Sequence, residues 1–344
     1  MFRDIALSDL LKKQEKNLIT LVDVRSPKEF AEFRMPGSIN IPLFTNEEHA
    51  EVGTLYKQVS IEAAKNKGLE IFSAKLPQFI ATFQQLEKAP IVYCSRGGMR
   101  SKIAATVVDL MGMKVLRLAG GIRSYRKWTV KQLAAESFAK RMYVLNGYTG
   151  SGKTLLLKHL KDQNYPVLDL EAMANHRGSV FGEVGLVSNN QRAFDSLLVK
   201  KLYDYKESSF WLLEGESRRI GKVCLPQALF ERKEASTQLF IHLPLEKRVE
   251  NILQDYQPEK YQAEVNAAFQ RIKKHIHLPI AKKISQDLVE KNYPEAIALL
   301  LEYYYDPLYE HTLAHYAKNK QVHIQASSLE EAVAAVKNFI AENE

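Results

Sequence analysis

The sequence has few cysteines and no long apolar segment. Cys94 and Cys224 are the only cysteines in 344 residues, which is too few for a disulfide framework, so we expect a reducing compartment. No apolar run reaches the roughly 18 to 20 residues that a membrane-spanning helix needs. The opening stretch "MFRDIALSDLLKKQEKN" lacks the apolar core of a secretory signal. Together these absences predict a cytoplasmic protein.

Length and charge set further bounds. A chain of 344 residues with 46% hydrophobic residues can bury more than one core, and its length favours two domains. The formal net charge of +8 suits an anionic partner such as nucleic acid. Charge alone does not specify a fold, so the organisation of the chain has to come from its residue patterns.

The first part of the chain alternates predicted strands and helices. Apolar runs and turn signals predict strands in "LITLVDV", "PIVYC" and "KVLRLAGG", and helical spacing predicts helices after "SP" and in "MRSKIAATVVDLMG". Strands that alternate with helices imply a parallel sheet covered on both faces. The stretch "YRKWTVKQLAAESFAKR" reads as a helical connector. We therefore predict a first α/β domain over residues 1–132.

The remainder, residues 133–344, is predicted to be a second α/β domain of the P-loop NTPase type with a helical C-terminal part. It begins with a strand, a loop and a helix in "MYVLNGYTGSGKTLLLKHL". Further strands are predicted in "YPVLDLE", "SSFWLLEGES" and "STQLFIHLPL". From about Glu246 onward the pattern is mostly helical.

A cysteine loop follows the predicted strand "PIVYC". Cys94 stands at the end of the strand, before a helix and beside Arg96 and Arg100. Convergent backbone N–H groups, allowed by Gly97 and Gly98, and neighbouring positive charge favour a thiolate. We therefore predict that Cys94 is a nucleophile that works beside an anion, with Arg96 and Arg100 assisting it. A buried cysteine that only fills space is the alternative.

A second loop, "GYTGSGKT", matches the P-loop pattern G-x-x-x-x-G-K-[ST] between a strand and a helix. Backbone amides around Gly147, Gly150 and Gly152 are expected to cradle phosphates. Lys153 would neutralise the phosphate charge, and the hydroxyl of Thr154 would bind Mg²⁺. The sequence thus predicts a phosphate or diphosphate site with a possible Mg²⁺ at Thr154.

Acidic partners for this loop are predicted on neighbouring strands. Glu214 in "FWLLEGES" takes the place of the usual acidic residue on the strand beside a P-loop, with Glu216 behind it. Asp169, at the end of "YPVLD", is the alternative magnesium or substrate ligand. An ordinary strand-end carboxylate is the competing interpretation of Asp169.

Three segments of the first domain resemble the landmarks of a rhodanese domain. They are "LVDVRSPKEFAEFRMPGSINIPL", "VYCSRGGMRS" and "LAGGIRSYRKW". The resemblance implies that Cys94 carries a persulfide and that Asp23 and Arg25 organise its surroundings. Five residues separate Cys94 from Arg100, one more than in the usual rhodanese loop and similar to cysteine phosphatases. A Cys-dependent phosphatase fused to a nucleotide-binding module therefore stays open as the alternative.

The fusion of this domain to a P-loop domain resembles the bacterial tRNA 2-selenouridine synthase family. The stretches "NHRGSVFGEVG", "EGESRRIGKVCLP" and "YYYDPLYEHT" extend the resemblance over essentially the whole chain. It implies a selenotransferase that replaces sulfur by selenium in wobble 2-thiouridine of tRNA. The implied co-substrates are geranyl diphosphate, used to geranylate the sulfur, and selenophosphate. A third class, a non-catalytic nucleotide-gated binding protein, would not need Cys94.

From this resemblance we infer which co-substrate each of the two loops binds. The P-loop would hold the diphosphate of the prenyl donor, and Cys94 with its arginines would handle selenophosphate. The residues themselves do not exclude ATP or GTP at the P-loop.

Several residues are candidates for binding tRNA or another substrate. Basic side chains in "SRRIGK" and "RIKKHIHLPIAKK" can engage phosphates, although a solvated helix face has the same pattern. The loop "NHRGS" is expected near the carboxyl ends of the strands, where substrates bind. The tyrosines of "YYYDPLY" could stack on a splayed anticodon base, but we favour a role in the core. The predicted substrate or tRNA residues are His176, Arg177, Arg218, Arg219, Lys273 and Lys274.

Overall fold

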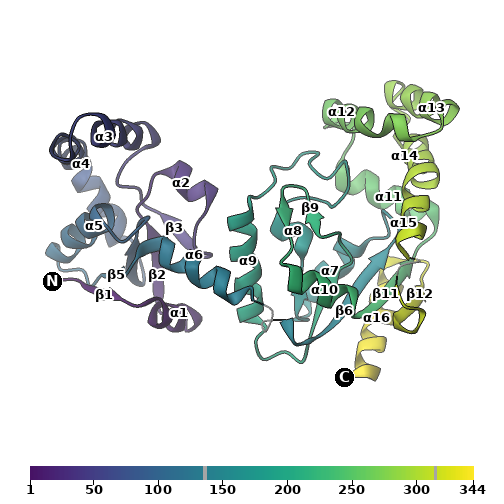
Figure 1. The fold of residues 1–344 in the computed structure, drawn as a ribbon, viewed down its shortest axis with the longest axis horizontal. Helices are drawn as coiled ribbons and strands as arrows, with labels where there is room; N and C mark the ends of the chain where they lie inside the picture. The colour runs from purple at the N-terminus through teal and green to yellow at the C-terminus, as the bar shows by residue number, and fades with distance from the viewer. Residues whose placement is uncertain (135–137, 314–315) are drawn as a thin grey trace. The chain divides into compact units, whose positions relative to one another are not determined.

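The computed structural model of the chain describes residues 1–134, 138–313 and 316–344, and Figure 1 shows its fold. The chain divides into two compact units. The first comprises Met1–Gln132 with Asp195–Leu197, and the second comprises Leu133–Phe194 with Leu198–Glu344. Within the described ranges, no helix is both long enough and apolar enough to cross a membrane.

A parallel five-stranded sheet in the order β1-β5-β4-β2-β3 lies at the centre of the first unit. This observation confirms the predicted parallel sheet. The elements of the first unit are β1 (Arg3–Ile5), α1 (Leu7–Glu15), β2 (Ile19–Asp23), α2 (Pro27–Glu32), β3 (Ser38–Asn40), α3 (Asn46–Gln58), α4 (Ile61–Gln84), β4 (Ala89–Tyr93), α5 (Met99–Leu110), β5 (Leu116–Leu118) and α6 (Gly121–Gln132). The predicted helical connector is observed as α6 up to Gln132, and residues 135–137 of it lie outside the described residues.

Alternating side chains of the central strands build an apolar core on each face of this sheet. Val22 and Val92 pack with side chains of α4 and α5, whereas Leu21 and Ile91 pack with side chains of α1 and α6. Cys94, directly after β4, belongs to the core on the α4 and α5 side. The cysteine loop therefore starts from a strand that is covered on both faces.

The second unit contains another parallel five-stranded sheet, in the order β12-β11-β6-β8-β7. The strand before the P-loop, β6, is central, and β8 is its direct neighbour. The elements of this unit are β6 (Arg141–Gly147), α7 (Lys153–Asp162), β7 (Val167–Leu168), α8 (Leu170–Ala174), α9 (Gln191–Asp204), β8 (Phe210–Glu214), β9 (Arg219–Ile220), β10 (Val223–Cys224), α10 (Gln227–Glu234), β11 (Thr237–His242), α11 (Leu245–Tyr256), α12 (Gln262–Ile272), η2 (Lys273–His275), α13 (Leu278–Val289), α14 (Tyr293–Leu300), the π-helical turn η3 (Leu301–Tyr305), α15 (Asp306–Leu313), η4 (Lys318–Lys320), β12 (Gln321–Gln325) and α16 (Leu329–Asn343).

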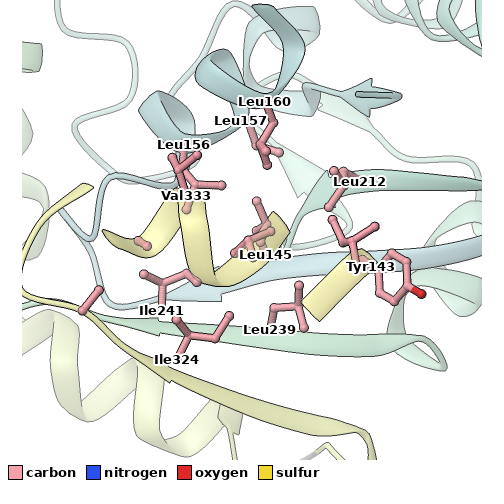
Figure 2. Packing of buried hydrophobic residues seen from close by; sticks show 14 of the residues in the cluster. Tyr143, Leu145, Leu156, Leu157, Leu160, Leu212, Leu239, Ile241, Ile324 and Val333 are labelled. Atoms are coloured by element: carbon pink, nitrogen blue, oxygen red, sulfur yellow. The ribbon is translucent and has the colours of Figure 1, made fainter. Parts of the chain in front are cut away.

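The core on one face of the second sheet holds the P-loop helix in place. Figure 2 shows Leu156 and Leu160 of α7 and Val333 of α16 against side chains of the sheet, including Leu145 and Ile241. The leucines of α7 recur at helical spacing, so one side of this helix is apolar and is buried on the sheet. The N-terminus of α7 is thereby fixed at the carboxyl end of β6, where phosphates bind in this type of fold.

The part after Glu246 is mostly helical, as predicted, with one strand that the prediction left out. Helices α12, α13 and α14 surround an apolar cluster of their own, which includes Val265, Phe269 and Leu288. Strand β12 then returns to the sheet and pairs in parallel with β11. Its "QVHIQ" alternation is too short to be distinguished from a loop by pattern alone.

Candidate functional site

The cysteine loop leads from β4 into α5. Cys94 is 3% exposed, and its Sγ atom lies 3.2 Å from the hydroxyl oxygen of Ser101 in the first turn of α5. Gly97 has a φ of +67°, which allows the tight curl of the loop. The loop therefore places the thiol at the helix N-terminus, as the sequence pattern indicated.

A second loop, at Gly120 and Gly121, packs against the cysteine loop. The backbone N–H of Ile122 donates to the carbonyl oxygen of Cys94 over 2.9 Å. Gly121 has a φ of +58°, and a Cβ atom at this position would clash with that carbonyl oxygen and lie 2.5 Å from the Gly97 amide nitrogen. Only glycine allows this approach, so the "GG" of the third rhodanese-like segment is required by packing.

Gly121→Ala is expected to destabilise the first unit by about 2–3 kcal/mol, because it combines a left-handed backbone with a backbone clash. Urea unfolding followed by the fluorescence of Trp128 measures this change, with Trp211 of the second unit replaced by phenylalanine in every variant. Gly53→Ala is the matched control, because Gly53 lies in α3 with no heavy atom within 4 Å of an added Cβ. Equal stabilities of the two variants would contradict the packing argument.

Arg100 is tied to a carboxylate rather than left free for an anion. Its guanidinium donates to both carboxylate oxygens of Glu29 on α2, over 2.5 and 3.1 Å, and to the hydroxyl of Ser95 over 2.9 Å. Arg96 is exposed. Asp23 and Arg25 form a buried ion pair at 2.6 Å beside the sheet. In the structure, Arg96 is thus the loop arginine whose side chain stands in solvent.

Glu29→Gln tests this pair through its pH dependence. Burial alone would raise the pKa of Glu29, but the hydrogen bond and charge of Arg100, together with His49, lower it to about 2. Since this pKa lies below the unfolded value of about 4.3, the ionised carboxylate stabilises the fold above that pH.

Glu29→Gln is therefore expected to lower the unfolding free energy by about 1–2 kcal/mol at neutral pH, after allowance for solvent screening. The loss should shrink as the pH falls from about 4.5 toward 2. Urea unfolding with the Trp128 readout measures it. Glu87→Gln, in an exposed loop, is the control. A difference that stays constant down to low pH would contradict the pairing.

The P-loop borders a cavity of about 520 Å³ in the second unit. All residues of the loop from Gly147 to Thr154 except Tyr148 line it, and so do residues of α11. Gly150 has a φ of +81°, and a Cβ atom there would lie 2.6 Å from the carbonyl oxygen of Arg248. The predicted phosphate loop thus forms part of the wall of a cavity at the N-terminus of α7.

Lys153 lies in this cavity with two carboxylates. Its ammonium donates to the Gly147 carbonyl oxygen over 2.7 Å. Burial lowers the pKa of Lys153, although Glu216 and Glu171 favour its charged form. Burial and Glu216 raise the pKa of Glu171 to about 8. All three side chains are partly buried, so a bound anion at the lysine and a bound cation at the carboxylates would stabilise their charged forms.

Of the carboxylates named in the sequence, only Glu216 lines the cavity, together with Glu171, which the sequence analysis did not name. Glu214 is fully buried, and one of its oxygens accepts from the Leu170 N–H over 2.6 Å. Asp169 caps α8 by accepting from the Ala172 N–H over 2.8 Å. Neither side chain lines the cavity, whereas Glu171 and Glu216 do. The roles of Glu214 and Asp169 as magnesium ligands stay predictions.

The oxygen donors at Thr154 fit Mg²⁺. The Thr154 hydroxyl lies 3.0 Å from a carboxylate oxygen of Glu171. Among the described residues, no group of three or more His, Cys, Asp or Glu side chains could hold a metal by itself. Mg²⁺ is usually bound by one or two protein oxygens together with substrate phosphates, so Thr154 and Glu171 suit an ion that a bound diphosphate completes.

His176 and Arg177 have different environments. His176 is buried, accepts from the Gly178 N–H over 3.1 Å, and has a lowered pKa because of its burial. It does not line the cavity. Arg177 does, where it is held by Asp255 at 2.9 Å and lies 4.7 Å over the Tyr256 ring. Of this predicted pair, the arginine is the residue in position to contact a ligand.

The basic candidates lie outside the cavity. Arg218, Arg219 and Lys274 are exposed, and Lys273 is half-buried over the Phe269 ring. These side chains are accessible to a phosphate backbone, and their role in binding tRNA stays a prediction.

Tyrosines of "YYYDPLY" line the cavity, although the sequence favoured a core role. Tyr305 and Tyr309 are part of the wall, and their hydroxyl oxygens are buried. Asp306 between them forms a bidentate ion pair with Arg248, whose Nε atom donates to the carbonyl oxygen of Thr149 in the P-loop over 2.9 Å. The motif was the available signal, but it does not distinguish the partly buried Tyr305 and Tyr309, which line the cavity, from the exposed Tyr303.

Comparison with known proteins agrees with both units. A family model described as a rhodanese-like domain matches residues 6–127, and one described as the tRNA 2-selenouridine synthase AAA domain matches residues 140–277. The predictions of a rhodanese-like domain and a following P-loop domain are thereby confirmed.

Full-length relatives are similar across both domains. The chain is 34% identical to the tRNA 2-selenouridine synthase of Nitrosomonas eutropha, over 84% of this chain and 87% of the relative. It is 33% identical to that of Hydrogenovibrio crunogenus, over 94% of this chain and 95% of the relative. The corresponding values for Bdellovibrio bacteriovorus are 32%, 89% and 93%. The chain therefore belongs to the tRNA 2-selenouridine synthase family.

Proposed function

We propose that this chain converts 2-thiouridine at the wobble position of tRNA to 2-selenouridine, in two steps. In the first, the thiocarbonyl sulfur attacks the allylic carbon of geranyl diphosphate, a carbon–sulfur bond forms, and the carbon–oxygen bond to diphosphate breaks. In the second, selenium from selenophosphate bonds to the same ring carbon, geranylthiol leaves, and water takes up the phosphoryl group. Alkylation turns a poor sulfur leaving group into a good one.

The observation that carries this proposal is the P-loop cavity with its lysine and carboxylates. The leaving diphosphate gains negative charge as the carbon–oxygen bond breaks, and preorganised donors stabilise such charge. The amides of the P-loop and Lys153 would hold the diphosphate. Thr154 and Glu171 would hold Mg²⁺, which neutralises phosphate charge when it is bound. The relatives carry a synthase name that supports tRNA as the substrate.

Cys94 is assigned to the selenium step. Its thiol lies beside Ser101 in the first turn of α5, and a helix N-terminus is an environment suited to an anionic selenophosphate or a selenium-bearing intermediate. Exposed Arg96 would attract this anion, whereas Arg100 would keep the loop in place through Glu29. We place the reaction in the cytoplasm, where we expect tRNA to be modified.

Mass spectrometry of tRNA nucleosides tests the function. Thiolated tRNA is incubated with the full chain, geranyl diphosphate and Mg²⁺, with and without selenophosphate. We expect the mass of one geranyl group to be added first, and 2-selenouridine to form only when selenophosphate is present. Unchanged tRNA, together with Cys94-dependent hydrolysis of a phosphoester, would favour the phosphatase alternative and contradict the proposal.

A further inference from the structure

A second, smaller cavity of about 60 Å³ lies beside the P-loop cavity. Its wall is almost entirely apolar and comes mostly from the helical part of the second unit. The residues of its far wall are Val265 of α12, Leu288 of α13, and Ala296, Ile297 and Leu300 of α14. Such a lining offers no pattern of donors and acceptors that could recognise a nucleotide base, so it suits a hydrocarbon group.

The two cavities share part of their walls. Thr149, Ser179, Ile252, Tyr256 and Tyr305 line both of them. Thr149 belongs to the P-loop itself, so the apolar cavity begins next to the place where a diphosphate would be held. A ligand whose diphosphate occupies the P-loop can therefore extend an apolar tail past Tyr256 and Tyr305 into the second cavity.

One continuous segment contributes residues to both cavities. Helix α14 contributes Ala296 and Leu300, the π-helical turn η3 contributes Leu301 and Tyr305, and α15 follows directly with residues that line the larger cavity. π-Helical turns are rare and are frequent at functional sites. The ion pair between Asp306 and Arg248 fixes this segment against the P-loop. The segment thus holds the wall of the smaller cavity at a fixed position beside the P-loop.

We propose that the apolar cavity, called here the tail pocket, holds the distal prenyl unit of the diphosphate substrate. The near prenyl unit would lie at the junction, between Tyr256 and Tyr305. One enclosed water needs roughly 10–15 Å³ of such space, so the tail pocket has room for about four to six waters, close to one five-carbon unit. This inference rests on the proposed function, which places a prenyl diphosphate at the P-loop. It adds the residues that select the tail and a limit on its length.

Binding of a ligand series to the unaltered full chain tests the tail pocket. Isothermal titration calorimetry in the presence of Mg²⁺ would compare the affinities for inorganic, dimethylallyl, geranyl and farnesyl diphosphate. Geranyl diphosphate is expected to bind on the order of 100-fold more tightly than inorganic diphosphate, because apolar area is buried. Farnesyl diphosphate should gain nothing further. Equal affinity for inorganic and geranyl diphosphate would overturn the inference.

Variants then locate the tail. Ala296→Leu fills the tail pocket and is expected to lower the affinity for geranyl diphosphate at least 10-fold, with binding of inorganic diphosphate unchanged. Ala298→Leu is the matched control, two residues along α14 and outside the pocket wall. Equal effects of the two variants on geranyl diphosphate would overturn the assignment. Should Ala296→Leu fail to fold, the ligand series on the unaltered chain still decides.

Failure of the inference and failure of the function give different results. Geranylation of tRNA without any preference for geranyl over inorganic diphosphate would contradict the tail pocket and support the proposed function. The opposite result would be a clear preference for geranyl diphosphate that Ala296→Leu abolishes, while tRNA stays unmodified. It would support the tail pocket and contradict the proposed function.

Discussion

Lys153→Ala is expected to slow tRNA geranylation by on the order of 100- to 1000-fold, the usual cost of removing one donor that stabilises transition-state charge. The ammonium lies in the P-loop cavity, 2.7 Å from the Gly147 carbonyl oxygen. The ammonium is partly buried, and its attraction to a phosphate is stronger there than it would be in bulk water. Selenation of tRNA that already carries the geranyl group should proceed at a near-normal rate, because that step is assigned to Cys94.

Single-turnover mass spectrometry of each step separates these expectations. One reaction starts from thiolated tRNA with geranyl diphosphate, and the other starts from geranylated tRNA with selenophosphate. Lys158→Ala is the control, since Lys158 is an exposed lysine on the same helix, α7, outside the cavity wall. Normal geranylation by the Lys153 variant would show that the diphosphate is held elsewhere.

Cys94→Ser is expected to reduce selenation by on the order of 10⁴-fold or more, as is usual when a nucleophile is removed, and to leave geranylation intact. Serine is similar in size and can still hydrogen-bond Ser101, whose hydroxyl lies 3.2 Å from the sulfur. The fold should therefore persist while the chemistry of the thiol is lost, because a serine hydroxyl is a much weaker nucleophile than a cysteine sulfur.

The same pair of reactions measures the cysteine variant. Cys224→Ser provides the control, since Cys224 is the other free thiol and is exposed on β10. Loss of geranylation together with selenation would mean that the two steps do not belong to separate sites. Normal selenation by Cys94→Ser would exclude the thiol from the chemistry and favour direct transfer from selenophosphate.

The two loops could be found in the sequence because their chemistry is local. In "VYCSRGGMRSK" and "GYTGSGKT", a strand, glycines and a helix start lie within about a dozen residues, and backbone geometry makes such spacing informative. The parallel sheets followed for the same reason, since alternating strands and helices leave few ways to cover a sheet. Family segments spread over the chain added the order of the domains.

The partners of those loops come from far away in the chain. Arg100 meets Glu29 across 71 residues, and Thr154 meets Glu171 on another element. Tyr305 reaches the P-loop cavity from a π-helical turn about 150 residues later. No local pattern indicates such contacts, because they depend on how layers pack around each sheet. Glu214 is the last residue of β8 and is buried. Glu216 follows the end of the strand by two residues and lines the cavity.

The sequence by itself thus determined the fold class, the positions of the two glycine-rich loops and the family, because short patterns of residues specify them. Tertiary structure alone decided which carboxylates surround Lys153, which arginine of the cysteine loop is already paired, and that an apolar pocket opens beside the P-loop. The physical reason is that charge, burial and cavity shape belong to packed side chains from several elements, and folding alone brings them together.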